Sequence, residues 1–454
     1  MNFDSYLKRE KELAIKLERL TILSGIPLWR IIRLEFRHRF LNTSFKTIPC
    51  RVSIGHQLLN VLFSLVSILS LLVKRKKFDN IIFPHPRLFY VNGKYLERFS
   101  DFLVEQSKIK ESYIILERHQ NGIHKKPRLH ANKVVYLDMI DVLSMLLKYF
   151  VYPYVYIKYK REINKIYELL NEEFHLSDES YKKMFGMIIS NFIVSYHLFS
   201  PVISVISPKR VFLAPRSTFK SVIAYCARRG IVTYELQHGV VVGDTVLYAG
   251  QYSPEIDPNF FLVHGKDNIG TQYGMPLERV INVGYPYKNY VISEALKSDK
   301  LHDSKKILVV SDPHVSSKII DTIILLTEYF PDYVFHIRCH PQEKVAESDL
   351  LKVVNNKGIE IVDNSTESFF TLALYDTIIG ENSTVLYEAM SLHKRVGRLN
   401  FNGLHVVENH DIHGGFVINS VNDFQLFMNT EYDGSRDNND IYSDYNEIIV
   451  NNLM

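Results

Sequence analysis

From residue 78 onward, short apolar runs alternate with longer stretches of helical periodicity, and this alternation limits the fold more than any other feature of the 454-residue chain. Strands joined through helices form parallel sheets that are covered by helices on both faces. The sequence therefore predicts an α/β domain over residues 78–290. We expect its strands at 80–83, 113–116, 134–137, 211–213, 232–236, 260–263 and 281–283. We expect its helices at 138–150, 158–171, 181–199 and 218–229.

A second series of the same kind predicts another α/β domain over residues 291–430. Residues 287–304 lack a strong apolar run and are expected to link the two domains. Two sheet domains joined once imply a cleft between the carboxyl edges of their sheets. The tail, 431–454, is expected to pack back on the first domain. The second domain's strands are expected at 305–310, 333–338, 359–362 and 395–399, and its helices at 316–329 and 367–374.

Residues 1–77 form a basic, helical N-terminal region with 15 Lys and Arg against 5 Asp and Glu, whereas the remaining residues hold 39 against 45. A basic segment on a slightly acidic body favours an anionic partner surface. No nucleic-acid-binding module is recognisable, so the expected partner is a membrane and not nucleic acid. The helix expected at 28–40 carries Arg30, Arg33, Arg37 and Arg39. These arginines either face a membrane surface or pack along apolar surface with their charges in water.

The apolar run 58–73 is followed by Lys74-Arg75-Lys76-Lys77. Its length is short for a membrane span, which needs about 20 residues. Serines recur at every third position within it, so one stripe of the helix is more polar. We expect a helix that is either buried in the first domain or lies in a membrane interface.

A cytoplasmic location at the inner face of the cell membrane is predicted. The first 25 residues are charged throughout, which is unlike a secretory signal. The three cysteines are widely spaced and none forms a Cys-x-x-Cys, so neither a disulfide framework nor a zinc site is expected.

Two strand ends in the second domain carry side chains that suit an anion. One strand runs from Tyr333 into a Cys-His-Pro sequence, and the other is followed by Gly-Glu-Asn-Ser-Thr at the start of a helix. Hydroxyls and free backbone N–H groups at a helix start bind anions, and ligands of open α/β sheets bind at this edge. We predict that a nucleotide-activated donor binds here with its phosphates at these two turns. The candidate donor-binding residues are Arg338, His340, Pro341, Asn382, Ser383, Thr384 and Glu388.

The first domain has a polar strand end of its own. After the strand at 232–236 come Gln237, His238 and Gly239, and the loop then reaches Asp244. Histidine suits proton transfer because its unperturbed pKa lies near neutrality. We predict His238, Glu235 and Asp244 as candidate catalytic residues, with Gln237 and Gly239 lining the cleft.

These motifs, taken in chain order, resemble those of bacterial GT-B glycosyltransferases that build surface polysaccharides. The matching residues are Gln237-His238-Gly239, His340-Pro341, and Ser383-Thr384 with Glu388, and the resemblance covers about residues 205–400. Capsule-type transferases that use CMP-activated acidic sugars share a His-Pro motif and a serine-rich turn. CDP-glycerol glycerophosphotransferases of teichoic acid synthesis have His-Gly and His-Pro motifs, but usually carry Trp where this chain has Gln237.

The resemblance implies a fold of two Rossmann-like domains facing a cleft, with a helical N-terminal extension. It implies that His340 contacts the donor phosphate, that Pro341 shapes the turn, and that Ser383 and Thr384 donate hydrogen bonds to phosphate oxygens. Glu388 would accept from ribose hydroxyls. His238 would act as general base or as a second phosphate contact. The donor would be CMP- or CDP-linked. The chain has no Asp-X-Asp triplet, so neither an essential metal nor a cofactor is expected.

The predicted activity is sugar transfer from a nucleotide donor to a growing surface polysaccharide or a lipid-linked glycan. Three alternatives stay open. In a CDP-glycerol-type polyol phosphotransferase the displacement occurs at phosphorus. A sugar-nucleotide 2-epimerase shares the two-domain architecture and needs no acceptor. A non-catalytic glycan-assembly subunit would bind nucleotide or membrane without reaction.

Overall fold

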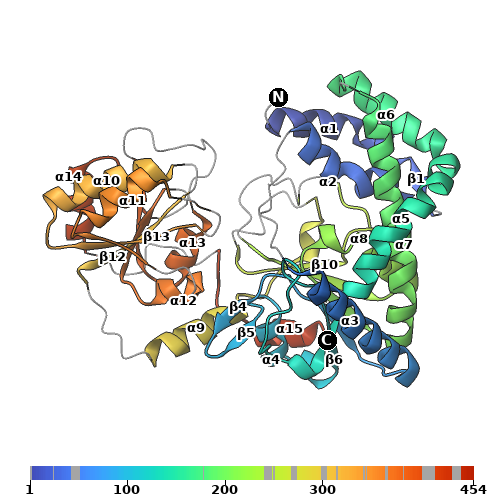
Figure 1. The fold of residues 1–454 in the computed structure, drawn as a ribbon, viewed down its shortest axis with the longest axis horizontal. Coiled ribbons are helices and arrows are strands. Elements are labelled where there is room, and N and C mark those ends of the chain that lie inside the picture. Colours follow the sequence, from blue (N-terminus) through green and yellow to red (C-terminus); the bar gives the residue numbers. More distant parts are fainter. Residues whose placement is uncertain are drawn as a thin grey trace.

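The structure is a computed structural model of the chain, and Figure 1 shows two α/β domains with a layer of helices beside the first. Residues at 24, 177, 382 and in several loops lie outside the described part. The description covers residues 3–23, 25–41, 52–176, 178–239, 248, 251–266, 274–297, 304–312, 315–340, 343, 345–362, 367–381, 383–400, 415–431 and 441–454.

The first domain is built on a seven-stranded sheet in the order β11-β10-β9-β8-β3-β6-β7, and every pair in it is parallel. Buried apolar residues lie on both faces of the sheet, as a parallel sheet requires. The strand order reverses between β3 and β8, which is where ligands bind in such sheets. The strands are β3 (Asn80–Phe83), β6 (Tyr113–Glu117), β7 (Val134–Tyr136), β8 (Arg210–Leu213), β9 (Val232–Leu236), β10 (Phe260–Val263) and β11 (Val280–Asn282).

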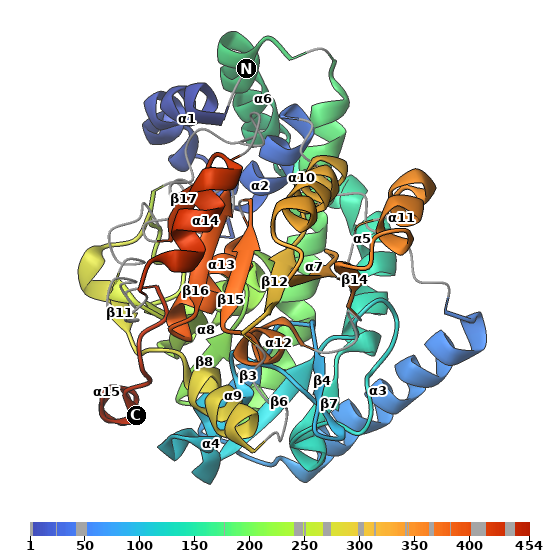
Figure 2. The ribbon, with the colours of Figure 1, turned by 90° about the vertical axis from the view of Figure 1, so that its left-hand side faces the viewer.

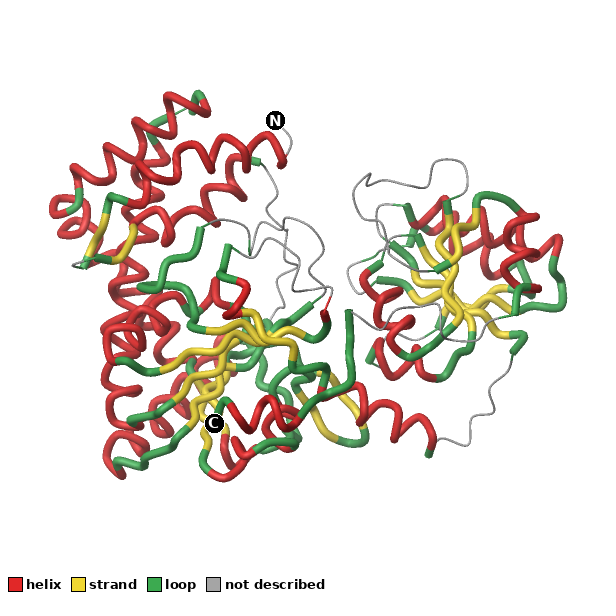
Figure 3. Tube along the Cα trace, turned by 180° about the vertical axis from the view of Figure 1, so that it is seen from behind, coloured by secondary structure: helices red, strands yellow, loops and turns green. Residues whose placement is uncertain are grey.

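The second domain has a six-stranded parallel sheet in the order β14-β13-β12-β15-β16-β17, with the reversal between β12 and β15. Figure 3 shows the two sheets as separate groups of strands. The strands are β12 (Lys306–Val310), β13 (Val334–Arg338), β14 (Ile359–Ile361), β15 (Thr377–Gly380), β16 (Arg395–Leu399) and β17 (Phe416–Ile418).

Helices cover both faces of the second sheet. One face packs against α10 (Ser316–Tyr329), α11 (Glu347–Val354) and α14 (Val421–Asn429). The other packs against α9 (Pro286–Leu296), α12 (Ser368–Ala373) and α13 (Thr384–Ser391). The segment expected to be a plain link, 287–304, thus begins as a helix. Its Tyr287 is fully buried and donates a hydrogen bond to Glu367 Oε2 at 3.0 Å.

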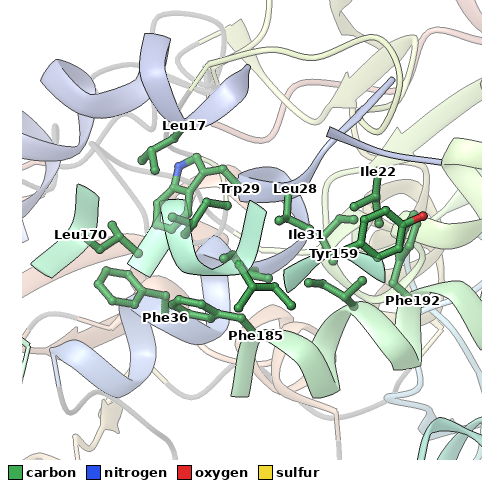
Figure 4. Packing of buried hydrophobic residues seen from close by; sticks show 14 of the residues in the cluster. Leu17, Ile22, Leu28, Trp29, Ile31, Phe36, Tyr159, Leu170, Phe185 and Phe192 are labelled. Carbon is green, nitrogen blue, oxygen red and sulfur yellow. The ribbon is translucent and has the colours of Figure 1, made fainter. Parts of the chain in front are cut away.

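The helical region packs around one apolar core shared by α1 (Phe3–Glu18), α2 (Leu28–Phe40), α6 (Lys160–Phe174) and α7 (Ser180–Ile206). Figure 4 shows Trp29, Phe36, Leu170 and Phe185 meeting in this core. The arginines of α2 were expected either to face a membrane or to keep their charges in water. Both expectations are wrong for Arg30, Arg33 and Arg37, because all three side chains are buried. Arg37 is held by Glu10 of α1, with Nε at 2.9 Å from Oε2, and Arg30 is held by Asp257.

The carboxyl-terminal segment lies against the first domain. Tyr285 N donates to Ser443 O at 2.9 Å, and Ser443 N donates to His264 O at 2.8 Å. Val450 of α15 (Glu447–Asn452) is buried in the core on one face of the first sheet. Gly284 is needed at this crossing, because its φ is +74° and a Cβ would lie 2.1 Å from Asp444 O.

The apolar run predicted at 58–73 forms α3 (Ile54–Lys74), which lies along the outside of the first domain (Figure 2). One stripe, Ser64, Ile68 and Leu71, is buried against the domain. Ser64 Oγ donates to Tyr136 O at 2.6 Å and accepts from Met139 N at 3.1 Å. The expected polar stripe therefore faces the protein at Ser64. The other side of the helix is exposed and apolar.

Candidate functional site

A cavity of about 770 Å³ lies between the two domains, and we call it the interdomain cavity. The predicted fold class, two Rossmann-like domains of GT-B type facing a cleft with a helical N-terminal extension, is confirmed by the two parallel sheets and by this cavity. Five predicted donor-binding residues line it together: Arg338, His340, Ser383, Thr384 and Glu388. Pro341 and Asn382 lie outside the described residues.

Arg338 and His340 reach the cavity from the carboxyl end of β13. Arg338 is 8% exposed and donates from Nη1 to Thr371 Oγ1 at 2.9 Å, which fixes its guanidinium beside the start of α12. The backbone N–H of His340 donates to Glu343 Oε2 at 2.8 Å. Ser311, at the end of the neighbouring strand β12, donates to the other oxygen of Glu343 at 2.8 Å. One carboxylate thus ties together the turns after two adjacent strands.

Ser383 and Thr384 lie at the amino end of α13. Ser383 is the N-cap residue, and its Oγ accepts from Val385 N at 3.3 Å. Thr384 is the first residue of the helix. The amino end of a helix carries partial positive charge and unpaired N–H groups, so this end of α13 favours an anion in the cavity.

Glu388 lies one turn further into α13, and its carboxylate is enclosed by protein. It is 3% exposed, and its Oε1 lies 3.1 Å from Arg98 Nη1. Burial raises the pKa of Glu388, and the charge of Arg98 opposes that rise. Glu388 would therefore contact a ribose, as predicted, only with a carboxylate that also stays bound to Arg98.

The first-domain side of the cavity comes from a segment that the sequence analysis did not single out. The hairpin β4 (Phe89–Val91) and β5 (Lys94–Leu96) presents Arg87 and Arg98 at its two ends. Lys125 also lines the cavity. Burial lowers the pKa of Arg87, and the charge of Arg98 adds to that effect. The sequence does carry a signal here, because Pro84-His85-Pro86 follows β3 as Cys339-His340-Pro341 follows β13.

His238 lies beside the carboxyl end of β3, next to His85. The two imidazole rings stack with centroids 5.4 Å apart, and the residues after His85, Arg87 and Leu88, line the cavity. Tyr248 Oη is 2.9 Å from His238 Nδ1. Burial, with help from the charges of Arg216 and Arg98, lowers the pKa of His238 to about 4. His238 is therefore neutral at pH 7, with one ring nitrogen unprotonated.

Two other predicted residues of this strand end hold the sheet together. Glu235 is fully buried, where it pairs with the Arg216 side chain and accepts from Arg216 N at 2.8 Å. Gln237 is also fully buried and joins β9 to β10 by accepting from His264 N at 2.7 Å. Its Nε2 donates to Gly239 O at 2.8 Å, which shapes the turn after His238. The predicted catalytic Asp244 lies outside the described residues.

Lys394 lies at the opposite edge of the second sheet. It donates to Ala373 O at 3.1 Å and borders a separate cavity with Lys305 and Asp332. Its position just before β16 places it at an amino end, so the strand direction separates it from His340 and Ser383.

No protein-family model matches the chain, and no curated protein matches it. Among solved structures, the UDP-GlcNAc 2-epimerase of Methanocaldococcus jannaschii has a TM-score of 0.49 and 11% identity, covering 82% of this chain and 98% of that one. The Neisseria meningitidis UDP-GlcNAc 2-epimerase, bound to UDP-GlcNAc, has a TM-score of 0.46 and 12% identity, covering 82% and 98%. The wall teichoic acid polymerase TagF has a TM-score of 0.40 and 11% identity, covering 88% and 87%. The strand orders of the two parallel sheets define the fold independently of these likenesses.

Proposed function

We propose that the chain is a metal-independent glycosyltransferase that moves a sugar from a nucleotide-activated donor to a growing surface polysaccharide or a lipid-linked glycan. The interdomain cavity carries this proposal. Its second-domain side offers His340, Ser383 and Thr384 at strand and helix ends, and its first-domain side offers the cationic Arg87 and Lys125. A nucleotide leaving group gains negative charge as its bond to the sugar breaks, and fixed donors and cations aimed at that charge lower the barrier.

The proposed donor is CMP- or CDP-linked, a choice that follows the resemblance of the motifs. Its phosphates would lie between the amino end of α13 and the turn after β13. A helix end contributes about 0.3–2 kcal/mol toward an anion, so it cannot hold the donor alone. Arg338, which lies 2.9 Å from Thr371 and faces the same cavity, supplies a full charge at that position.

The proposed proton acceptor is His238. If Nδ1 donates to Tyr248 Oη, the lone pair of Nε2 is free to take the proton of an acceptor hydroxyl. The hydroxyl oxygen then bonds to the anomeric carbon while the bond from that carbon to the donor phosphate breaks. The nucleotide leaves with the bonding electrons, and the result is inversion at the anomeric carbon. In this reaction Glu235 would have an indirect role, because it holds the Arg216 side chain and the end of β9 in place.

Thermal unfolding of the purified chain with CMP, CDP, UMP, UDP, GDP or ADP, in EDTA, tests the donor site. A nucleotide that binds only the folded protein raises its stability. We expect CMP or CDP to raise Tm, His340→Ala to abolish the rise, and His393→Asn to keep it. His393 is a matched control because it is exposed at the other end of the same domain. Absence of any rise with all six nucleotides would overturn the proposal.

The products separate the alternatives. Incubation of donor with an acceptor glycan should release nucleotide and lengthen the glycan by a sugar. Phosphate in the product backbone would identify the polyol phosphotransferase instead. An isomerised donor sugar in the absence of acceptor would identify the 2-epimerase. Full glycan assembly by the double variant His340→Ala, Ser383→Ala would identify the non-catalytic subunit.

We further propose that the protein docks on the anionic inner face of a membrane through the exposed sides of α3 and of α5 (Asp138–Lys158), which pack side by side. Among the described residues, three helices, α3, α5 and α7, are long and apolar enough to cross a membrane, yet α7 is half buried and α3 keeps one stripe against the protein. Such helices are better suited to lie in the membrane interface than to cross the membrane. The exposed apolar residues are Ile54, Leu58, Leu59, Leu62, Phe63, Val66, Leu69 and Val73 of α3, and Met145, Leu146, Leu147, Tyr149, Phe150, Tyr154 and Ile157 of α5.

A further inference from the structure

Two imidazole rings lie side by side at the carboxyl edge of the first sheet. His85 comes two residues after β3, and His238 comes two residues after β9. Their ring centroids are 5.4 Å apart, with an interplanar angle of 15°. The strand order reverses beside β3, and the strand ends at such a reversal are where ligands bind in parallel α/β sheets. The proposed function uses His238 and leaves His85 without a role.

The backbone after His85 determines which nitrogen of its ring carries the proton. Arg87 N donates a hydrogen bond to His85 Nδ1 at 3.2 Å. A nitrogen that accepts from an N–H group is unprotonated, so the proton of the neutral ring lies on Nε2. Burial lowers the pKa of His85 to about 3, with the charges of His238 and Arg87 adding to the effect, so the ring is neutral at pH 7. His85 thus offers one N–H donor, at Nε2.

The Nε2 atoms of both rings are accessible to a ligand. In the part of the chain that the structure describes, no group makes a hydrogen bond to either atom, and neither atom is enclosed without a partner. The two residues that follow Pro86, Arg87 and Leu88, line the interdomain cavity. Because the rings stack directly on each other, a molecule that reaches His238 from this cavity also comes within reach of His85.

We propose that His85 is a second catalytic residue of the transfer, a neutral donor that holds the acceptor beside the hydroxyl on which His238 acts. This inference rests on the proposed function, which places the reacting hydroxyl at His238. The Nε2–H group of His85 donates a hydrogen bond to a neighbouring oxygen of the acceptor and so orients it toward the anomeric carbon. His85 keeps its own proton, because the hydroxyl proton moves to His238 and the nucleotide leaves with the bonding electrons. The acceptor that fits carries a second oxygen near its reacting hydroxyl, as sugars do.

Nitrogen NMR of the full chain, with its histidines labelled, tests both rings without any substitution. We expect His85 to show an unprotonated Nδ1 and a protonated Nε2 between pH 6 and pH 8. The probes are the methyl glycosides of glucose, galactose, mannose and N-acetylglucosamine, each added in excess. We expect at least one probe to shift the Nε2 resonances of His85 and His238 together. A protonated Nδ1 in His85, or a failure of all the probes to shift its Nε2 resonance, would overturn the proposal.

Two replacements of His85 separate the hydrogen bond from the ring contact. Gln carries an amide N–H group in place of Nε2–H, whereas Phe keeps a ring and has no donor. With donor and acceptor glycan, we expect His85→Phe to lower kcat/KM by about tenfold, as for the loss of one hydrogen bond, and His85→Gln to keep most of it. His119→Phe is the control, because His119 is an exposed histidine whose Nδ1 accepts from Gly122 N at 2.9 Å. Equal kcat/KM in the two Phe variants would contradict a catalytic His85.

Nucleotide binding distinguishes a failure of this inference from a failure of the proposed function. His85→Phe should keep the rise in Tm with CMP or CDP, because the donor phosphates are placed at His340 and Ser383 of the other domain. Loss of that rise in His85→Phe would assign His85 to the donor and overturn its role toward the acceptor. Absence of the rise in the unsubstituted chain would count against the donor site alone, since the NMR series contains no nucleotide.

Discussion

Arg98 of the first domain lies between two carboxylates of the second, with its Nη1 at 3.1 Å from both Glu367 Oε1 and Glu388 Oε1. Its guanidinium is 5.0 Å from the ring centre of Phe99 and 5.1 Å from that of Phe89. Glu367 caps α12 by accepting from Phe370 N, and Glu388 lies within α13. One arginine thus joins the first domain to the two helices that border the donor side of the interdomain cavity.

Replacing Arg98 by Met should therefore weaken both the fold and the site. The substitution leaves two buried carboxylates without their cation, and breaking a buried pair in this way costs about 3–5 kcal/mol. We expect a clear fall in urea midpoint and a loss of nucleotide binding. The control is Lys209→Met, which removes an exposed ion pair with Asp79 and should leave stability nearly unchanged. Equal stability of the two variants would show that Arg98 does not join the domains.

The same variant should have a characteristic dependence on pH. Burial raises the pKa of Glu388, and removing Arg98 takes away the charge that opposes the rise. A carboxyl whose pKa is raised in the folded state binds protons more tightly there, so stability falls as pH increases through that pKa. Arg98→Met should thus lose stability relative to the unsubstituted protein more strongly at pH 8 than at pH 5. Urea midpoints at the two pH values measure this, and a constant difference would contradict it.

Ser383→Ala should separate the capping role of this serine from its proposed contact with phosphate. Loss of an N-cap hydroxyl costs about 1 kcal/mol. Ser420→Ala is a matched control, since Ser420 caps α14 by accepting from Asp423 N at 3.2 Å. We expect similar stability losses, with weaker nucleotide binding only for Ser383→Ala. Equal binding by the two variants in calorimetric titration would limit Ser383 to capping.

The sequence predicts local elements well where the hydrophobic pattern decides them. The expected strands at 232–236 and 260–263 and the helix at 316–329 match β9, β10 and α10 residue for residue. The helix expected at 138–150 is eight residues too short, because α5 continues through Pro153, a residue that usually ends helices. The same hydrophobic patterns place the His340 and Ser383 motifs at the carboxyl edge of the second sheet.

Contacts between residues that lie far apart in the sequence could not be predicted. Arg98 and Glu388 are 290 residues apart, and neither periodicity nor motif links a hairpin arginine to a helix carboxylate. The arginines of α2 have an ordinary amphipathic spacing, and only the packing of Glu10 and Asp257 against them turns that face inward. Such contacts depend on how the domains assemble, which local sequence does not encode.

The partly buried histidine His238 should make the protein sensitive to acid. Its pKa is lowered to about 4 by burial, so the folded state resists taking up the proton that the unfolded chain binds near pH 6.5. Stability should therefore fall as pH decreases from about 6.5 toward 4. His238→Gln should make that fall less steep, as measured by urea midpoints between pH 7 and pH 4.5.

His124 offers a comparison of opposite sign. Burial alone would lower its pKa, but its contact with Asp138 Oδ2 at 2.7 Å and the nearby Glu117 raise it instead. This group stabilises the folded state below pH 6.5 and loses the effect as pH rises through its folded pKa. His124→Gln should thus lower the urea midpoint more at pH 6 than at pH 8, with a constant effect below pH 6. The same change in slope for both variants would contradict the opposite surroundings of the two rings.

The exposed apolar side of α3 and α5 should bind lipid vesicles. Phe63 and Phe150 are 60% and 80% exposed, and burying such a side chain contributes about 1.5–3 kcal/mol. Phe63→Glu and Phe150→Glu should each weaken vesicle partitioning by about tenfold or more. Val354→Glu is the control, because Val354 is 81% exposed on α11 of the other domain.

Lys74, Arg75, Lys76 and Lys77, all exposed at the end of α3, should add attraction to anionic lipid that weakens as salt increases. Co-sedimentation with anionic and neutral vesicles measures both effects. Equal binding to the two kinds of vesicle would remove the electrostatic part, and equal loss in Val354→Glu would remove the assignment of this face.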